Sequence, residues 1–370
     1  MRFGLLTYGL ERPAFGIARS VLSLGRALQQ TAGAEPLFLT TYRRGPFVEP
    51  ETPHAYVPGA RLLPALMSIG ALQLHRLATR LQLPLVHDPS GVCPFVVGRR
   101  TARYGRVVTL HDATSFRYPA THSLLDNILQ LWYVPATLRN VDAIITPTAD
   151  SKRDLVRFLR LEPQRVHVVP GAVEAMFRPA PPAVVEAVLR QLGLCQPYVL
   201  YVGALEPRKN LPTLVRAFGQ VRREQPGLQL VVVGGRRWKS SRLLPRDLEA
   251  VRLTGYVPDE LLPALYTGAA AFCFPSLAEG FGLPVLEAMA CGTPVITSTT
   301  SSLPEVAGEA ALLVDPLDEH ALAGAVRRVL TDADLAHDLR ERGRQRAAIF
   351  SWTRSAEMTL AVYQAVLRSS

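Results

Sequence analysis

Short apolar runs alternate with longer amphipathic segments along almost the whole chain, and this alternation restricts the fold more than any other feature. Continuous runs of Val, Ile and Leu between helical segments are typical of parallel strands that are buried on both faces. We predict an α/β fold with two doubly wound sheets. The expected strands are 2–8, 37–41, 85–87, 107–110, 142–146 and 166–169, then 198–202, 228–233, 270–274, 294–297 and 311–314.

A proline-rich stretch separates the two series of strands. Five of the chain's 30 prolines lie between residues 170 and 197, a density that is typical of a linker. At 370 residues the chain is long for one core and suits two. We therefore predict domains over 1–175 and 176–350, followed by an amphipathic C-terminal helix over 351–370.

The composition favours a cytoplasmic protein. No run of eighteen uncharged apolar residues could span a membrane, and the N-terminal apolar run turns polar at Thr7, too early for a signal peptide. The four cysteines are far apart and form no Cys-x-x-Cys pair, so free thiols are expected rather than disulfides or a zinc site.

Positive charge is concentrated in the first half of the chain. Residues 1–175 hold 20 Lys and Arg against 12 Asp and Glu, whereas the remainder holds 21 against 19. Such an excess suggests an anionic partner, although an arginine-rich surface without a partner would look the same. The dispersed cations and the lack of an aromatic strip argue against nucleic acid. The apolar stretch 62–83, with its arginines, fits either peripheral contact with an anionic membrane or burial against the first domain.

Residues 275–294 form the most informative segment. Gly280 and Gly282 precede a predicted helix, and a glycine loop at a helix N-terminus exposes backbone amides to an anion. Glu279 and Glu287 flank this loop, and carboxylates are better suited to binding sugar hydroxyls than phosphate. The alternative is that Glu287, in the first turn, offsets the helix dipole and the glycines only turn the chain.

Three further segments place candidate ligand-binding residues between strands and helices. Arg208 and Lys209 follow the strand 198–202, before a helix that Asn210 could cap, where two cations would neutralise a diphosphate or remain solvated. His111 and Asp112 follow the strand 107–110 at the expected ligand edge, although the histidine could be a core residue and the aspartate a turn cap. Gly16, between the first strand and helix, lies outside any Gly-x-Gly-x-x-Gly pattern.

Glu279 and Glu287 stand eight residues apart around Gly-Phe-Gly-Leu-Pro, downstream of Pro-Arg-Lys-Asn at 207–210. In this the chain resembles the retaining nucleotide-sugar glycosyltransferases of the group-one, family-four type, closest in motifs to mannosyltransferases of polysaccharide assembly. The resemblance implies a GT-B fold, with two Rossmann-like doubly wound domains facing an interdomain cleft. The N-terminal domain would bind the acceptor, the C-terminal domain the nucleotide sugar, and the last helix would return to the N-terminal domain.

The resemblance also implies residue roles. Glu279 would hold the donor sugar's hydroxyls, Glu287 the ribose, and Arg208 and Lys209 the leaving diphosphate, while His111 would contact the sugar from the first domain. The implied catalytic residues are His111, Glu279, Lys209 and Arg208. The implied substrate-binding residues are Gly16, Asp112, Tyr256, Val257, Gly280, Phe281, Gly282, Leu283 and Glu287, with the Tyr256-Val257 pair beside the base.

Two positions depart from the family's pattern, namely Ala204, where many members carry arginine, and Ala18, where the first loop usually has another glycine. No segment resembles the Asp-x-Asp metal site of the other large glycosyltransferase fold, so we expect metal-independent transfer without a cofactor. The predicted function is transfer of a hexose, mannose from GDP-mannose, to a hydroxyl of a glycan or lipid-linked acceptor. The alternatives on the same fold are a UDP-glucose-dependent glucosyltransferase, a sucrose-type synthase, a phosphorylase and a sugar-nucleotide epimerase.

Overall fold

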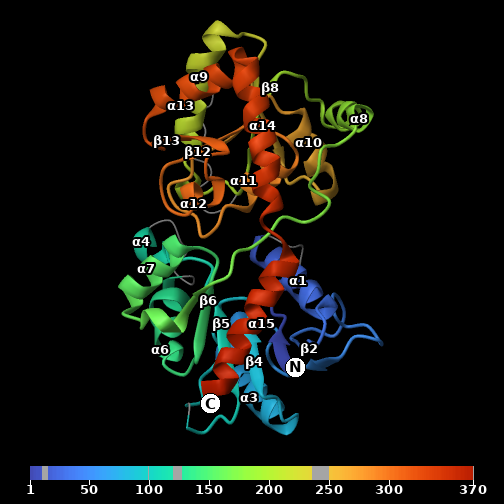
Figure 1. Cartoon of the computed structure of the whole chain (residues 1–370), viewed down its shortest axis with the longest axis vertical. Coiled ribbons are helices and arrows are strands. Elements are labelled where there is room, and N and C mark those ends of the chain that lie inside the picture. Colours follow the sequence, from blue (N-terminus) through green and yellow to red (C-terminus); the bar gives the residue numbers. More distant parts are fainter. Residues whose placement is uncertain (11–15, 99, 120–126, 236–249, 370) are drawn as a thin grey trace. The chain divides into compact units, whose positions relative to one another are not determined.

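The chain forms two compact units, which the computed structural model describes over residues 1–10, 16–98, 100–119, 127–235 and 250–369 (Figure 1). The first unit comprises Met1–Gly171 together with Ser351–Ser370, and the second comprises Ala172–Phe350. The chain therefore leaves the first unit four residues before the expected boundary and returns to it at its C-terminal end.

The first unit is built on a parallel seven-stranded sheet in the order β3-β2-β1-β4-β5-β6-β7. The strand order reverses between β1 and β4, which is where such sheets bind ligands beyond the strands' carboxyl ends. The strands are β1 (Arg2–Leu6), β2 (Glu35–Thr40), β3 (His54–Tyr56), β4 (Leu85–Asp88), β5 (Gly105–Thr109), β6 (Ala143–Thr146) and β7 (Val166–Val168).

Helices cover both faces of this sheet, which explains why its strands read as continuous apolar runs. On β5, Val107 packs into one core cluster and Val108 into the other, because successive side chains point to opposite faces. The helix α15 packs against α1 and β5 on the first face (Figure 1). The helices are α1 (Gly16–Gln30), α2 (Leu63–Ala65), α3 (Ala71–Arg80), α4 (Thr114–Arg117), α6 (Val134–Leu138), α7 (Ala149–Leu159) and α15 (Trp352–Ser369), with π-helical turns at Leu66–Gly70 and Leu129–Tyr133 and a 3-10 turn at Pro163–Arg165.

A buried histidine fixes α15 to the sheet. Nδ1 of His87 on β4 lies 2.6 Å from the hydroxyl of Tyr363 on α15, and Nε2 lies 2.9 Å from Oγ1 of Thr109 on β5. Burial lowers the pKa of His87 to about 3, with a smaller contribution from His111, so the ring stays neutral. The C-terminal helix is thus an integral layer of the first unit.

The second unit is built on a parallel six-stranded sheet in the order β10-β9-β8-β11-β12-β13. Its strands are β8 (Tyr198–Val202), β9 (Gln229–Val233), β10 (Val251–Gly255), β11 (Ala271–Phe274), β12 (Val295–Ser298) and β13 (Ala311–Val314). Its helices are α8 (Pro182–Leu192), α9 (Leu211–Glu224), α10 (Leu262–Gly268), α11 (Leu283–Ala290), α12 (Leu303–Ala307), α13 (Glu319–Thr331) and α14 (Ala333–Ala348), with 3-10 turns at Pro207–Lys209 and Asp259–Leu261.

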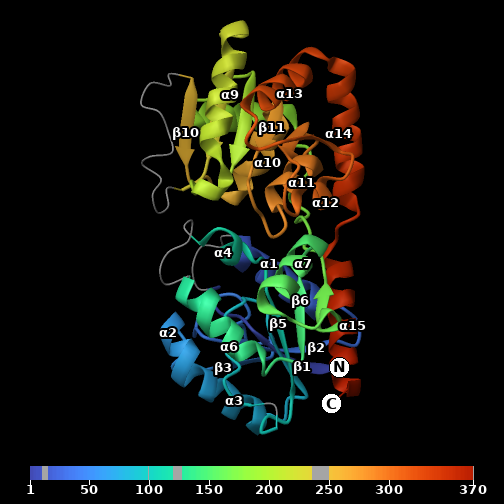
Figure 2. The same ribbon diagram turned by 90° about the vertical axis from the view of Figure 1, so that its left-hand side faces the viewer.

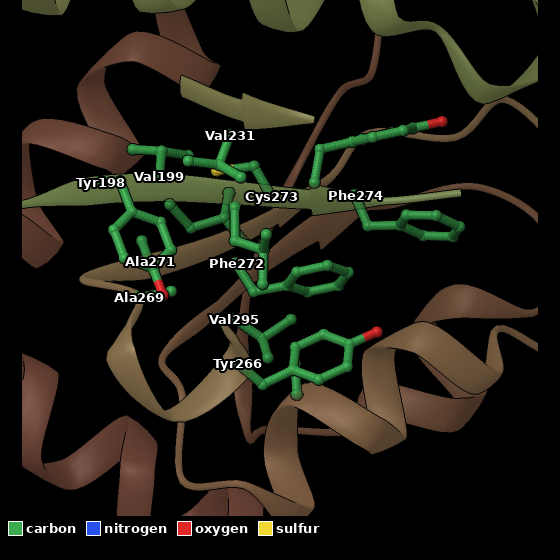
Figure 3. Close-up of a cluster of buried hydrophobic side chains, with 14 of the residues drawn as sticks. Tyr198, Val199, Val231, Tyr266, Ala269, Ala271, Phe272, Cys273, Phe274 and Val295 are labelled. Atoms are coloured by element: carbon green, nitrogen blue, oxygen red, sulfur yellow. The ribbon is translucent and has the colours of Figure 1, made fainter. Parts of the chain in front are cut away.

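Aromatic side chains fill the core beneath the second sheet. Figure 3 shows Tyr266 from α10 beside Phe272 from β11, whose rings meet edge to face with centroids 5.4 Å apart. The Tyr198 hydroxyl donates to the carbonyl of Leu265 at 2.7 Å, which satisfies the polar end of a fully buried ring. This core supports the loops that follow β8 and β11.

The predicted α/β architecture is confirmed, with strand limits that mostly shift by one or two residues. The edge strands β3 and β10 were not predicted, because each carries polar or charged residues and pairs with a single neighbour in the part of the chain that the structure describes. The expected cap by Asn210 is wrong: its side chain makes no capping bond, and instead donates to the carbonyls of Pro275 and Pro316. None of the described helices has the length and apolarity to cross a membrane.

Candidate functional site

The loops after β8 and β11 meet because these strands are neighbours in the second sheet. The backbone amide of Leu277 donates to the carbonyl of Arg208 at 2.8 Å, and the hydroxyl oxygen of Ser276 lies 3.1 Å from the same carbonyl oxygen. Asn210 donates to the Pro275 carbonyl at 3.1 Å. These bonds bring two of the predicted motifs into one site at the carboxyl edge of the sheet.

Glu279 is the centre of this site. Its Oε1 lies 2.6 Å from Nζ of Lys209 and accepts a hydrogen bond from the hydroxyl of Ser276 at 2.6 Å. Its Oε2 accepts from Nη1 of Arg208 at 3.0 Å. Glu279 and Lys209 are each only 8% exposed, and the ammonium also lies 4.8 Å from the centre of the Phe274 ring. The result is a desolvated carboxylate held between two cations.

The charges of this cluster keep Glu279 ionised. Burial alone would raise the pKa of its carboxyl group, but the attraction of Lys209 and Arg208 outweighs burial and lowers the pKa to about 2. A buried charge is tolerated only when it is paired and hydrogen-bonded, as this one is. The carboxylate can therefore accept strong hydrogen bonds from hydroxyl groups at any ordinary pH.

Arg208 contacts carboxylates on both sides. Its Nε donates to Oε2 of Glu206 at 3.0 Å, and its Nη1 donates to the carbonyl of Ala278 as well as to Glu279. The sequence placed Arg208 on a leaving diphosphate, and that role stays a prediction. The contacts in the structure orient Glu279, and they also explain how a loop with Ala204 keeps its second cation ordered.

Serines from the loop after β12 shape the backbone before α11. Ser301 accepts a hydrogen bond from the Glu279 amide at 3.1 Å and donates to its carbonyl at 2.8 Å, and Ser302 donates to the same carbonyl at 2.9 Å. Gly282, at the N-terminus of α11, has a φ of 106°, and a Cβ there would lie 2.7 Å from Leu303. Sequence reasoning gave these serines no role, since their partners come from a different strand.

The predicted residues Gly280, Phe281, Gly282 and Leu283 lie in this same loop and first helical turn. The Phe281 side chain is buried, and its ring meets that of Phe350 edge to face at 5.7 Å. Its side chain therefore belongs to the core, and only its backbone is suited to a ligand. The helix N-terminus nevertheless provides the amide groups and positive dipole that an anion requires.

Glu287 lies in the second turn of α11, so its expected position in the first turn is wrong, because the helix begins only at Leu283. Its carboxylate is 3% exposed and accepts a hydrogen bond from the Tyr266 hydroxyl at 2.8 Å. Near the carboxyl end of β10, Val257 is buried in the core whereas Tyr256 is 54% exposed. The tyrosine ring is thus the member of this pair that can stack on a base.

The remaining predicted residues belong to the first unit. His111 and Asp112 follow β5, and Nε2 of His111 lies 2.8 Å from the carbonyl of Pro89. Oδ1 of Asp112 accepts from the backbone amide and the hydroxyl of Thr114 at 2.9 and 2.7 Å, which is a turn-capping arrangement. Gly16 is the exposed first residue of α1, and Phe15 before it lies outside the described residues.

A carboxylate missed by the sequence analysis is Asp88, at the end of β4. It is fully buried and accepts from the amide and hydroxyl of Ser90 at 2.9 and 2.6 Å, as Asp112 does with Thr114. The signal was an Asp-x-Ser or Asp-x-Thr triplet at the end of each of two strands. Over the described ranges, no group of three His, Cys, Asp or Glu residues could hold a metal ion, and metal independence stays a prediction.

Two family models match the chain. Residues 191–346 match the model of glycosyl transferases group 1, and residues 15–176 match that of glycosyltransferase family 4. O-antigen chain mannosyltransferase B of Escherichia coli is 35% identical over 288 residues, which are 76% of this chain and 74% of that protein. Alignments with seven further curated relatives cover between 29% and 66% of those proteins.

Solved structures match over the full length. Sucrose-phosphate synthase from Thermosynechococcus elongatus superposes with a TM-score of 0.80 at 27% identity, covering 100% of both chains. Anabaena Alr3699/HepE, solved in complex with UDP and glucose, superposes with a TM-score of 0.76 at 17% identity, covering 99% of this chain and 100% of that chain.

Proposed function

Because this chain belongs to the group 1 glycosyltransferases and has the GT-B fold, we propose that it transfers a hexose from a nucleotide diphosphate sugar to an acceptor hydroxyl, with retention of configuration. The observation that carries the proposal is the buried Glu279 carboxylate between Lys209 and Arg208, beside the N-terminus of α11. A carboxylate for sugar hydroxyls, a cation and a helix N-terminus for phosphate are the groups this chemistry needs.

The proposed transfer breaks the bond between the anomeric carbon and the diphosphate oxygen and forms a bond from that carbon to the acceptor oxygen. The acceptor's proton passes to the departing diphosphate oxygen on the same face of the sugar. Lys209 and the amides at the start of α11 stabilise the negative charge that develops on the diphosphate, a task that they can perform without a metal ion. Glu279 holds the donor sugar by its hydroxyls.

A route through a covalent sugar–enzyme intermediate would need a carboxylate nucleophile from the first unit. Asp112 was the one candidate in the sequence, and Asp88 is its neighbour across the sheet edge. Both turn an oxygen back onto the amide and hydroxyl of the residue two positions later, and Asp88 also uses its second oxygen on the amide of Cys93. This geometry supports the direct same-face route.

Mannose from GDP-mannose is the donor we propose. The segment Leu110-His111-Asp112 together with Glu-Pro-Arg-Lys-Asn at 206–210 resembles the pattern of mannosyltransferases. The relative that is 35% identical is named as a mannosyltransferase. UDP-glucose is the competing donor, and the similarity to a sucrose-phosphate synthase keeps a sucrose-type acceptor in view.

Binding and slow hydrolysis across GDP-, UDP- and ADP-sugars, with a chelator present, test this proposal. We expect selective binding of GDP-mannose and release of GDP and mannose, undiminished by the chelator. Selective use of a UDP-sugar would replace the donor but keep the reaction class. Binding of none of the panel would contradict the assignment of the diphosphate to Lys209 and α11.

The acceptor we propose is a glycan or lipid-linked hydroxyl, reached by peripheral contact with the inner face of an anionic membrane. Large apolar side chains are exposed on two helical segments of the first unit, one around α2–α3 and one just before α6. Figure 2 shows where α2, α3 and α6 lie in this unit. The Tyr133 hydroxyl donates to the Met67 carbonyl at 3.0 Å, so these segments lie side by side. We call this surface the apolar face, made of Leu62, Ile69, Leu72, Ile128 and Trp132.

The surroundings of the apolar face favour lipid over another protein surface of mixed charge. Arg61, Arg76, Arg80 and Arg139 lie in the same two segments, and neither 61–84 nor 127–141 contains an acidic residue. Apolar side chains with a tryptophan and a cationic rim are typical of surfaces that insert into the headgroup region of anionic bilayers. The opposite side of the first segment, with Leu66, packs into the core, and the exposed side is the one that we propose for lipid contact.

Replacing both Trp132 and Ile69 by alanine should weaken binding to vesicles of phosphatidylcholine with phosphatidylglycerol on the order of 10–100-fold, from the lost apolar burial. Flotation measures this, and the parent protein should not float with phosphatidylcholine alone. Leu317→Ala, which removes a 72% exposed leucine from the second unit, is the control and should float like the parent. A parent protein that does not float would contradict lipid contact. So would a parent protein that forms a dimer in solution which the double variant disrupts, because the apolar face would then be an interface between two copies of the chain.

A further inference from the structure

Asp88 is a fully buried carboxylate that the proposed reaction does not use. It is the last residue of β4, and both of its carboxylate oxygens accept hydrogen bonds from the loop that follows. Oδ1 accepts from the amide and hydroxyl of Ser90, at 2.9 and 2.6 Å, and Oδ2 accepts from the amide of Cys93 at 2.7 Å. These three hydrogen bonds fold residues 89–93 back over the carboxyl edge of the first sheet.

The loop 89–93 needs this support. Gly91 has a φ of 82°, and Cys93 has a φ of 58°, a left-handed conformation that is strained for a residue other than glycine. Gly91 also approaches the next strand so closely that a Cβ there would lie 3.1 Å from the carbonyl oxygen of Thr109. The loop is therefore pressed against the end of β5, two residues before His111.

The loop presents one carbonyl to His111. Nε2 of His111 lies 2.8 Å from the oxygen of Pro89, and a carbonyl oxygen can only accept, so Nε2 must carry a proton. Burial lowers the pKa of His111, although the Pro89 carbonyl, Asp112 and Asp88 act in the opposite direction. In the neutral ring the lone pair then resides on Nδ1, which has no hydrogen-bond partner within the described part of the chain.

We propose that Asp88 is a positioning residue for His111: by holding the Pro89 carbonyl against Nε2, it fixes the tautomer in which Nδ1 accepts a hydrogen bond from a substrate hydroxyl. The part of this inference that concerns a substrate hydroxyl rests on the proposed function, whereas the assignment of the His111 tautomer does not. His111 in this state cannot donate from Nδ1, so it serves a sugar hydroxyl and not the diphosphate. In this proposal Asp88 contacts neither the sugar nor the diphosphate, and it acts only through His111.

Asp88→Asn tests this inference, because the amide keeps the size but opposes the Cys93 or Ser90 donors with an NH2 group. The ring nitrogens of His111 are read by NMR in protein labelled with ¹⁵N-histidine, with His111→Asn to assign the signal. The parent should show the Nε2–H tautomer near neutral pH, and Asp88→Asn a mixture of tautomers. The kcat of transfer should fall roughly 10–100-fold with little change in donor KM, as for other residues that orient a functional histidine.

Asp318→Asn is the matched control. Asp318 caps α13 by accepting from the amides of His320 and Ala321, both at 2.9 Å, so the variant loses a similar capping carboxylate in the other unit. It should change neither the His111 signals nor kcat. If Asp88→Asn does not fold, Ser90→Ala removes only one hydroxyl bond and should shift the same signals to a smaller degree.

Unchanged His111 signals in folded Asp88→Asn would overturn the proposal, even with a lower kcat, because Asp88 would then act through stability alone. Shifted signals with unchanged kcat would also overturn it, because the tautomer would not matter to transfer. A parent enzyme that transfers from no donor would instead contradict the proposed function, and the NMR comparison would still decide what Asp88 does to His111.

Discussion

Lys209→Ala is expected to reduce kcat roughly 10²–10³-fold, the usual effect of removing one group that stabilises a developing oxyanion. The ammonium is buried against Glu279, in the loop before α11, so uncharged water that enters the site cannot replace it. The loss should fall on kcat more than on donor KM, because the diphosphate gains charge only as the sugar departs. Single-turnover rates with a saturating donor measure this effect.

The fold should tolerate the Lys209 substitution. Glu279 keeps its contacts with Arg208 and Ser276, so the free energy of unfolding should fall by about 2 kcal/mol, typical of one lost hydrogen bond to a charged group. Lys209→Met retains the apolar stem above Phe274, so it should be as inactive as Lys209→Ala but more stable than that variant. Arg216→Ala, which breaks an exposed pair with Glu319, is the control with full turnover. Normal turnover in both Lys209 variants would contradict the assignment of the diphosphate to this loop.

The sequence was sufficient to predict the doubly wound sheets, since buried parallel strands leave continuous apolar runs. It also placed Glu279 and Lys209 at the ends of strands in one domain, and neighbouring strands bring such ends together. What the sequence could not show is which side chains share a hydrogen bond across that edge. Ser301 and Asp88 gain their roles only from residues that the sheet order brings near them, and that order is not written in any one segment.

Edge strands and two-faced helices were the other limits of prediction. β10 includes Arg252 and Thr254 because, among the described residues, a strand pairs with only one of its edges, so its pattern resembles that of a loop. The stretch 62–83 combines buried Leu66 and Leu74 with exposed Ile69, and its π-helical turn disturbs the regular spacing of apolar residues. Burial and surface contact could not be separated from that pattern.

Glu279→Gln is expected to lower kcat about 10²-fold while leaving the affinity for the nucleoside diphosphate little changed. Glutamine keeps the size of the side chain but cannot accept charge-assisted hydrogen bonds from sugar hydroxyls. The diphosphate contacts proposed for Lys209 remain, and calorimetry with GDP and UDP tests them separately from turnover. Equal losses of nucleotide affinity and turnover would contradict the placement of Glu279 on the sugar.

The same variant also tests whether Glu279 is ionised in the folded protein, through the pH dependence of the free energy of unfolding. The pKa of Glu279 is about 2 in the folded protein and near 4.5 in an unfolded chain, so its ionised form stabilises the fold above about pH 4.5. As the pH falls from 4.5 toward 2, the unfolded state takes up the proton first, and a contribution of about 3 kcal/mol is lost. Urea unfolding across this range should therefore show a shallower pH slope for Glu279→Gln than for the parent.

Glu319→Gln, which changes a more exposed ion pair, should keep the parent's slope, because a screened pair shifts stability little. Equal slopes for the parent and Glu279→Gln would mean that the cations do not hold this carboxylate ionised, and its role as a charged acceptor for sugar hydroxyls would fail with that result.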